Sequence, residues 1–361
     1  MNTKNIVSEN LIEVLTKKPL IISGPCSAES EEQLIDIAVK LSKLNKVDIL
    51  RAGIWKPRTK PGGFEGVGTI GLPWLQKAKK LSGLPTMIEV ATAKHVEDAL
   101  TFDVDVLWIG ARTTVNPFSV QAIADSLKGV DIPVFIKNPV NPDLELWIGA
   151  IQRISKAGIK NIGLIHRGFS SFGNTHYRNA PMWNIPIELK VRFPELPLIC
   201  DPSHICGRRD TLQDVLQQSI NLDYDGVILE THNDPDNALS DAKQQITPEE
   251  FDKILENIIW RKEEVDTEEA SNILEKLRRE IDIVDDQILS MLSERMKVVE
   301  KIGNIKKQNN ITILQPSRWH EVIEHSIKKG EKLGLSKDFI EKYFESMHME
   351  SIRKQNQILG K

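Results

Sequence analysis

Cysteine is scarce in this sequence, which has three in 361 residues: Cys26, Cys200 and Cys206. An odd number at no disulfide-framework spacing excludes a scaffold held by disulfides, so we expect each thiol to serve packing or chemistry in a reducing compartment. Long apolar runs are also absent. No run approaches the roughly 20 residues that span a bilayer, and residues 1–20 contain no apolar core of a signal peptide. We therefore expect a cytoplasmic protein with no membrane partner.

An excess of charge of one sign is equally absent. The 47 Lys and Arg residues against 51 Asp and Glu give a formal net charge of -4. This balance provides no general basic surface for nucleic acid, so any anion site must be local. A chain of 361 residues, 40% of them hydrophobic, is large enough for two domains or for one α/β barrel with an appendage.

Eight short apolar runs alternate with amphipathic segments before residue 260. They occupy residues 20–23, 48–50, 86–90, 104–109, 134–136, 162–165, 198–200 and 226–229. Such alternation is typical of the α/β class, and eight strands predict a (β/α)8 TIM barrel. We place this barrel at residues 1–260.

A reactive or charged residue follows each run, in the order Cys26, Arg51, Glu89, Arg112, Lys137, Arg167, His204 and Glu230. These are the carboxyl ends of the predicted strands, where barrel enzymes carry their active sites. The Gly- and Pro-rich stretch at residues 50–66, LRAGIWKPRTKPGGFEG, adds Lys56, Arg58 and Lys60 to Arg51. Arg and Lys bind phosphate and carboxylate groups, so this stretch predicts an anion site; a basic surface loop is the alternative.

Four further side chains suggest a metal site. Cys26, His204, Glu230 and Asp241 provide a thiolate, an imidazole and two carboxylates at or just beyond the ends of the first, seventh and eighth predicted strands. The first and eighth strands are neighbours when a barrel closes, so the set predicts a site for a divalent metal. The alternative is a buried cysteine, a core histidine and two surface acids.

The sequence changes character after Trp260. Residues 261–270 are charged and predict a linker. In residues 271–361 apolar residues recur at three- and four-residue steps, which predicts a helix longer than thirty residues, a break at residues 308–312, and two more helices beginning near Pro316 and Ser336. Because the first helix is too long for a small monomeric bundle, we expect an all-α, three-helix domain that dimerises.

The motifs of the first part together resemble the 3-deoxy-D-arabino-heptulosonate 7-phosphate (DAHP) synthases, specifically the type I-beta group. They run in order as GPCSAES, RAGIWKPRTKPGGFEG, IGAR, IKNP, HRGF, DPSHICGRR, ETHNDP and SDAKQQ. The KPRT tetrapeptide disfavours the related Kdo-8-phosphate synthases, which carry a KANR-type sequence at that place.

The resemblance implies a ligand and a role for each site residue. A divalent metal, Mn²⁺ as first choice before Fe²⁺, Co²⁺ or Zn²⁺, would be held by Cys26, His204, Glu230 and Asp241. Phosphoenolpyruvate would be bound by Arg51, Lys56, Arg112, Lys137 and Arg167, and erythrose 4-phosphate by Lys56, Pro57, Arg58 and Thr59. C3 of phosphoenolpyruvate would attack the aldehyde, water would capture C2 and phosphate would leave, with Glu89 or Lys56 moving protons.

The tail resembles the AroQ-type chorismate mutases, through LRREIDIVDDQILSMLSERMKVVEKIGNIKK and an unbroken register to Ser351 and Gln355. The resemblance implies that chorismate is bound by Arg295, Arg318, Ser351 and, from the other subunit, Arg278. Lys306 and Gln355 would donate hydrogen bonds to the ether oxygen during the rearrangement. Trp319 and Gln315 stand where many AroQ enzymes have acids.

Both resemblances together imply a bifunctional enzyme of the shikimate pathway and aromatic amino acid biosynthesis. It would be inhibited by prephenate and form a homodimer through the helical domain, with further pairing through the barrels left open. The alternative is a DAHP synthase whose tail only binds chorismate or prephenate to regulate the barrel.

Overall fold

The computed structural model describes residues 9–56, 62–172, 176–262, 265 and 267–360. The chain forms two compact units, Met1–Glu263 and Glu264–Lys361.

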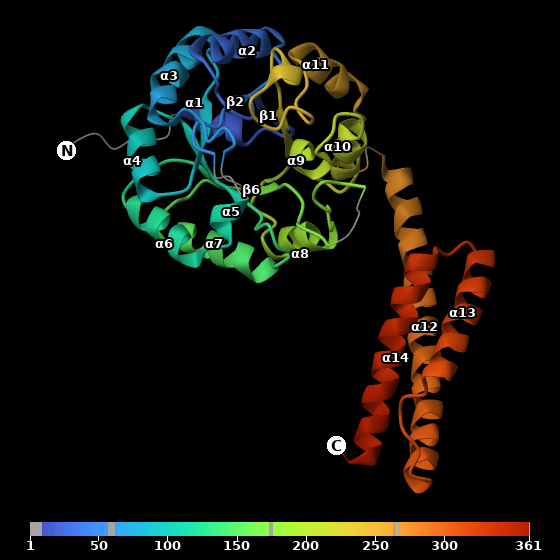
Figure 1. Cartoon of the computed structure of the whole chain (residues 1–361). Helices are drawn as coiled ribbons and strands as arrows, with labels where there is room; N and C mark the ends of the chain where they lie inside the picture. The colour runs from blue at the N-terminus through green and yellow to red at the C-terminus, as the bar shows by residue number, and fades with distance from the viewer. Residues whose placement is uncertain (1–8, 57–61, 173–175, 263–264, 266, 361) are drawn as a thin grey trace. The chain divides into compact units, whose positions relative to one another are not determined.

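Eight parallel strands close into a barrel in the first unit, in chain order around the ring, with β8 paired to β1 (Figure 1). The strands are β1 (Leu20–Gly24), β2 (Ile49–Arg51), β3 (Thr86–Val90), β4 (Val106–Ile109), β5 (Val134–Lys137), β6 (Ile162–His166), β7 (Leu198–Cys200) and β8 (Gly226–Glu230). Each begins within two residues of the apolar run that predicted it. The predicted (β/α)8 barrel is therefore confirmed.

Helices surround the strands as a ring (Figure 1). The ring contains α2 (Glu31–Lys43), α3 (Gly71–Ser82), α4 (Ala93–Thr101), α6 (Pro117–Ser126), α7 (Leu144–Lys156), α8 (Asn184–Arg192), α10 (Leu212–Asn221) and α11 (Pro248–Asn257). The unit also contains α1 (Glu9–Leu15), the short helices α5 (Ala111–Thr114) and α9 (Pro202–Cys206), and 3-10 turns at Gly68–Ile70 and Pro235–Asn237.

The barrel interior is a packed apolar core. Leu11 of α1 packs against inward-facing residues of the strands, among them Ile22, Val106 and Ile228. Ile12 and Leu15, also on α1, lie beside residues at the amino ends of β5, β6 and β7. Because α1 and the packed interior occupy that end, the polar chemistry is left to the carboxyl ends of the strands.

The second unit contains α12 (Glu268–Gln308), α13 (Pro316–Lys332) and α14 (Lys337–Leu359). Helix α14 packs along both α12 and α13, and the expected all-α character is confirmed. Helix α12 spans 41 residues and begins inside the predicted linker. It starts early because the Thr267 side chain caps it by accepting a hydrogen bond from the Ala270 N–H, and because Glu268 and Glu269 favour a helix N-terminus.

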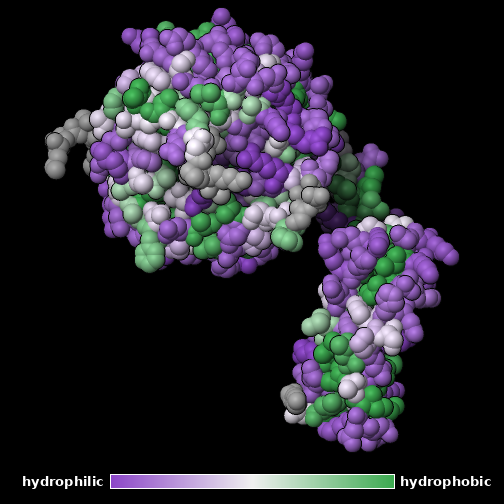
Figure 2. Space-filling model, viewed as in Figure 1, coloured by the Kyte–Doolittle hydropathy of each residue, from purple (hydrophilic) through white to green (hydrophobic). Residues whose placement is uncertain are grey.

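Much of α12 exposes apolar side chains. Ile273, Leu277, Ile281, Val284 and Ile288 are all exposed in the single chain, and Figure 2 shows apolar patches on the surface of this unit. None of the helices in the described chain combines the length and apolar character needed to cross a bilayer.

Candidate active sites

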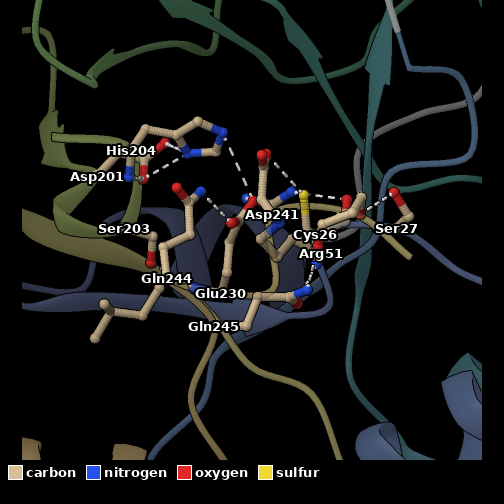
Figure 3. Close-up of polar contacts among 12 residues, drawn as sticks. Cys26, Ser27, Arg51, Asp201, Ser203, His204, Glu230, Asp241, Gln244 and Gln245 are labelled. Carbon is tan, nitrogen blue, oxygen red and sulfur yellow. Dashed lines mark hydrogen bonds and ion pairs between the residues drawn. The ribbon is translucent and has the colours of Figure 1, made fainter. Parts of the chain in front are cut away.

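Three of the predicted metal ligands meet beyond the carboxyl ends of β1 and β8. Sγ of Cys26 and one carboxylate oxygen from each of Glu230 and Asp241 lie within 4.8 Å of one another. Cys26 Sγ is 3.4 Å from Asp241 Oδ2. The fourth predicted ligand, His204, lies on α9 after β7, and its Nε2 is 3.7 Å from Glu230 Oε1. Figure 3 shows the four side chains turned toward one another.

His204 is oriented by Asp201, which caps α9. The Asp201 carboxylate accepts a hydrogen bond from the His204 backbone N–H at 3.1 Å and lies 2.9 Å from Nδ1 of the ring. With Nδ1–H donating to Asp201, Nε2 keeps its lone pair on the side of Glu230. Burial lowers the pKa of His204 against the opposing charges of Asp201 and Glu230. The ring is therefore neutral near pH 7, as a metal ligand must be.

Glu230 and Cys26 are fully buried, and one oxygen of Glu230 is incompletely satisfied. Glu230 Oε1 accepts no hydrogen bond from the described residues, although Arg51 Nη1 approaches it to 3.0 Å out of alignment. Burial and the charge of Glu230 raise the pKa of Cys26 to about 12, so a close cation is needed to stabilise the thiolate. A sulfur, an imidazole nitrogen and carboxylates with a spare oxygen form a donor set that fits a first-row divalent metal.

Two buried cations at the barrel mouth lie near the ring of Trp108. The Arg51 guanidinium lies 5.0 Å and Lys137 Nζ 5.7 Å from the centroid of the indole ring. Arg51 donates to the backbone oxygen of Cys26 at 3.3 Å, and Lys137 pairs with Asp201 at 2.8 Å. Both cations therefore reach the metal-ligand cluster, directly or through one residue.

Lys56 approaches the cluster from the loop after β2. Its Nζ is 3.0 Å from Cys26 Sγ. Gly53 provides the space, since a Cβ at residue 53 would lie 2.7 Å from Lys56 Cε. The backbone N–H of Lys56 donates to Glu65 O at 2.9 Å. Three predicted ligands of erythrose 4-phosphate, Pro57, Arg58 and Thr59, lie outside the described residues.

Another group of cations follows β4 and β6. Arg167 is buried, and its backbone N–H donates to Asn138 Oδ1 at 2.7 Å, which fixes the turn after β6. Burial lowers the pKa of Arg167 to about 10; the charge of Asp201 opposes this shift, and those of Arg178 and Arg112 add to it. Cations that disfavour one another's charge favour an anion beside them.

Glu89 lies at the end of β3 and faces Trp108. Its Oε2 accepts a hydrogen bond from Trp108 Nε1 at 3.2 Å. A Cβ at residue 110 would lie 2.0 Å from Glu89 Oε1, so the glycine there leaves the space that this carboxylate fills.

In the helical unit, α12 and α14 bring together four of the predicted mutase residues. Arg295 donates to Ser351 Oγ at 2.8 Å. Lys306 is 9% exposed, its pKa is lowered by burial, and its Nζ donates to Ile313 O at 2.6 Å. Gln355 is buried, and its Oε1 has no hydrogen-bond partner in the described part of the chain. These side chains form a polar and cationic cluster suited to an anion.

The other two predicted arginines are solvent-exposed in the single chain. Arg278 and Arg318 pair with acids on their own helices, Glu275 and Glu321, and their side chains are 68% and 70% exposed. They thus contrast with the buried Lys306 and Gln355.

Trp319, at the position where many AroQ enzymes have an acid, stacks on His348 of α14. The ring centroids are 4.0 Å apart and the planes differ by 11°. Burial lowers the pKa of His348, and the charges of Arg295 and Lys306 act in the same direction. An aromatic pair therefore borders the cationic cluster.

Comparison with known proteins assigns the first unit. A sequence profile of the DAHP synthetase I family matches residues 7–267. The chain belongs to this family. It is 33% identical over 238 residues to a phospho-2-dehydro-3-deoxyheptonate aldolase of Thermotoga maritima, covering 66% of this chain and 68% of the relative. A crystal structure of the DAHP synthase of Thermotoga maritima aligns with a TM-score of 0.59 and 30% identity, over 66% of this chain and 67% of the other.

Other relatives are named for a different reaction. A 2-dehydro-3-deoxyphosphooctonate aldolase of Geotalea uraniireducens is 28% identical over 272 residues, covering 70% of this chain and 96% of the relative.

The second unit has its own match, because a profile of type II chorismate mutases matches residues 277–356. The chain therefore joins a DAHP synthase domain to a chorismate mutase domain, and the architecture implied by the two resemblances is confirmed.

Sequence reasoning missed the residues that hold the predicted metal ligands. Asp201 stands inside the DPSH motif, and Gln244 and Gln245 inside SDAKQQ. Gln245 Oε1 accepts a hydrogen bond from the Cys26 N–H at 2.9 Å, and Gln244 Nε2 donates one to the buried carboxylate of Glu230. An acid or amide three or four residues from a predicted ligand was the available signal.

Proposed function

We propose that the barrel condenses phosphoenolpyruvate with erythrose 4-phosphate in a metal-dependent reaction that gives DAHP and phosphate. The metal dependence is supported by the donor atoms of Cys26, His204, Glu230 and Asp241, which face one another beside buried cations. When bound, a divalent cation would supply Lewis-acid polarisation of the substrate aldehyde. Mn²⁺ is the first choice, and Fe²⁺, Co²⁺ and Zn²⁺ suit the same donor set.

Two groups of cations would bind the two anionic ends of phosphoenolpyruvate, one group the carboxylate and the other the phosphate. Arg51 and Lys137 would bind its carboxylate, since both lie at the barrel mouth beside the metal-ligand cluster. Arg167 and Arg112 would bind its phosphate, because the buried Arg167 lies near Arg178 and Arg112, whose charges add to the lowering of its pKa by burial. This division would direct C3 of the enol toward the aldehyde of erythrose 4-phosphate, whose own ligands would be Lys56, Pro57, Arg58 and Thr59.

Proton transfer would fall to Lys56 and Glu89. C3 of phosphoenolpyruvate forms a bond to the aldehyde carbon, and the aldehyde oxygen takes a proton. Lys56 is suited to donate it, because its Nζ lies 3.0 Å from Cys26 Sγ. A water molecule adds to C2 and loses a proton. Glu89 would accept this proton, as the carboxylate that is hydrogen-bonded to Trp108 Nε1. Cleavage of the C2–O bond then releases phosphate.

The second activity, the conversion of chorismate to prephenate, would use the cluster between α12 and α14. Arg295, Arg318 and Ser351 would bind the carboxylates and their surroundings. Lys306 and Gln355 would donate to the ether oxygen as negative charge develops there. The partly desolvated Lys306 supports this role, because a charge in a buried site acts strongly on a nearby oxygen.

A homodimer would complete this site. Arg278 precedes Arg295 by about five helical turns, roughly 25 Å, so the two cannot bind one small molecule within a single chain. The exposed apolar residues of α12 lie on both sides of Arg278. Covering them with a second copy of the helix would bring the partner's arginine to this chain's Arg295.

Prephenate would inhibit the synthase. The support is the joining of an early and a later reaction of one pathway in a single chain. An effector made by one unit would then control the flow through the other.

Both activities can be tested in the full chain. Cys26→Ala should abolish condensation and preserve chorismate turnover, whereas Arg295→Ala should do the reverse. Chelation by EDTA should remove condensation alone, and arabinose 5-phosphate should not replace erythrose 4-phosphate. A wild-type chain that binds prephenate without converting chorismate would instead support a purely regulatory tail.

A further inference from the structure

An arginine in the loop after β6 joins the two carboxylates of the metal-ligand cluster. Arg178 Nη1 donates to Asp241 Oδ1 at 3.1 Å and to Gln244 Oε1 at 2.7 Å. The buried Gln244 in turn donates from Nε2 to Glu230 Oε2 at 2.6 Å, a contact drawn in Figure 3. Hydrogen bonds therefore run without a break from Asp241 through Arg178 and Gln244 to Glu230.

The same arginine is attached to α9, the helix that carries His204. Its backbone N–H donates to Cys206 O at 3.2 Å, and the side chain of Asn179 donates to His204 O at 2.6 Å. Gly207 ends α9 with a φ of 66°. A Cβ at residue 207 would lie 2.5 Å from Arg178 Cβ, so a glycine is needed there for the arginine to pass.

Each of the two carboxylates has one oxygen held by Arg178 or Gln244 and the other directed at the remaining predicted ligands. Asp241 Oδ1 faces Arg178, while Oδ2 lies 3.4 Å from Cys26 Sγ. Glu230 Oε2 faces Gln244, while Oε1 accepts no hydrogen bond from any described residue. A carboxylate fixed through one oxygen has lost the freedom to turn, so its second oxygen stays directed at the common centre.

We propose that Arg178 and Gln244 are positioning residues that preorganise Asp241 and Glu230 for a divalent metal. The proposal rests on the metal dependence inferred above. Arg178 and Gln244 act through the two carboxylates, because Arg178 Nη1 and both polar atoms of the Gln244 side chain contact those carboxylates or each other.

Charge and positioning predict opposite effects for Arg178. Its guanidinium places a positive charge one carboxylate away from the expected cation. By Coulomb repulsion alone, its removal would tighten the binding of a divalent ion. If Arg178 fixes the carboxylate instead, its removal weakens binding. The sign of the change therefore separates the two effects.

The experiment titrates Mn²⁺ into the full chain after chelation and dialysis, and follows free Mn²⁺ by electron paramagnetic resonance. Arg178→Gln and Gln244→Leu should each weaken Mn²⁺ binding, roughly 10- to 100-fold. Arg178→Lys keeps the charge but loses the planar fork, so its loss should be smaller. At saturating Mn²⁺ the variants should recover most of the wild-type condensation rate.

Arg208→Gln is the matched control. Arg208 is an exposed arginine just beyond α9 that pairs with Asp210 and with neither carboxylate of the cluster. Its replacement should leave the affinity for Mn²⁺ unchanged.

Unchanged or tighter Mn²⁺ binding by Arg178→Gln, with normal binding by the wild type, would overturn the proposal. A wild-type chain that binds no Mn²⁺ would instead contradict the metal dependence itself. Thermal unfolding of each metal-free protein shows whether the barrel is intact. If Arg178→Gln fails to fold, Arg178→Lys and Gln244→Leu decide the question, because each retains most of the packing volume.

Discussion

Replacing Asp201 by Asn tests whether one buried carboxylate both stabilises the barrel and orients a metal ligand. Asp201 is fully buried and contacts three groups: Lys137 Nζ at 2.8 Å, His204 Nδ1 at 2.9 Å and the His204 backbone N–H at 3.1 Å. Asparagine has nearly the same shape and can still cap α9. It cannot neutralise Lys137, so the substitution isolates the charge.

The expected magnitude follows from the burial of the pair. Removing one partner of a buried ion pair costs about 3 to 5 kcal/mol, because the other charge is left uncompensated. Since asparagine keeps the cap, we expect a loss of about 3 kcal/mol in the free energy of unfolding. His204 also loses the carboxylate that fixes its ring, so the affinity for Mn²⁺ should fall roughly 10- to 100-fold.

Urea unfolding followed by tryptophan fluorescence measures mainly the stability of the barrel. Six of the seven tryptophans lie at or before residue 260, and Trp319 is the single one after residue 270. Asp48→Asn is the matched control. Asp48 pairs with Lys17 at 2.6 Å and accepts from the Ile21 N–H at 2.8 Å, next to the amino end of β2. Its replacement should leave the affinity for Mn²⁺ unchanged.

The pH dependence gives an independent check on Asp201. Burial alone would raise the pKa of this carboxyl, but the charges of His204 and Lys137 hold it well below its usual value. A depressed pKa stabilises the fold above the unfolded-state pKa of about 3.9, and this contribution is lost as the pH falls through the folded-state pKa. The gap between wild type and Asp201→Asn should therefore be constant from about pH 6 to 8 and narrow below about pH 4. A gap smaller than about 1 kcal/mol at pH 7, or one that widens in acid, would refute the reasoning.

Three further substitutions test other parts of the molecule. Gly110→Ala should displace Glu89, because the new Cβ would lie 2.0 Å from its Oε1. The kcat for condensation should fall at least roughly tenfold. Gly149→Ala is the control, because a Cβ at residue 149 meets nothing within 4 Å. Trp319→Ala should raise KM for chorismate more than it lowers kcat. Trp319→Phe preserves the stack on His348, so its KM and kcat should stay near those of the wild type. Equal losses of mutase activity in the two variants would contradict a role for the aromatic pair. Ile281→Lys places a charge on an exposed apolar position of α12. Sedimentation velocity should show a weaker dimer, and mutase activity should fall while condensation is preserved. An unchanged dimer would contradict the proposed interface.

The strands and the long helices could be predicted because their patterns are local. A buried parallel strand must be apolar along its length, and the runs at residues 134–136 and 198–200 show this directly. The start of β4 was placed two residues early because Val104 is apolar and buried without belonging to the strand. Asp105, between Val104 and the first strand residue Val106, accepts a hydrogen bond from the Thr86 N–H and pairs with Lys79.

The candidate site could be predicted only where chemistry follows a strand directly. Cys26, Arg51 and Glu230 are placed by the barrel itself, since the carboxyl ends of parallel strands meet at one rim. Arg178 lies between β6 and α8, and its place depends on a hydrogen bond to α9 and on the glycine at residue 207. No periodic pattern in the sequence encodes such a placement.

The charges at the barrel mouth give a second reason to expect a divalent ion in the proposed condensation. Besides polarising the substrate aldehyde, the ion would offset the negative charge of the substrates. Five cations, Arg51, Lys56, Lys137, Arg167 and Arg178, lie close to four carboxylates, Glu89, Asp201, Glu230 and Asp241. This near balance allows the charges to be buried before any substrate arrives. Phosphoenolpyruvate and erythrose 4-phosphate would add roughly four to five negative charges, far more than the one excess cation can offset. A divalent cation within the carboxylate cluster, together with the exposed Arg112, would restore much of the balance. The proposed metal ligands and anion-binding cations would thus form one electrostatic arrangement, and we expect the affinity for the substrates to depend on both.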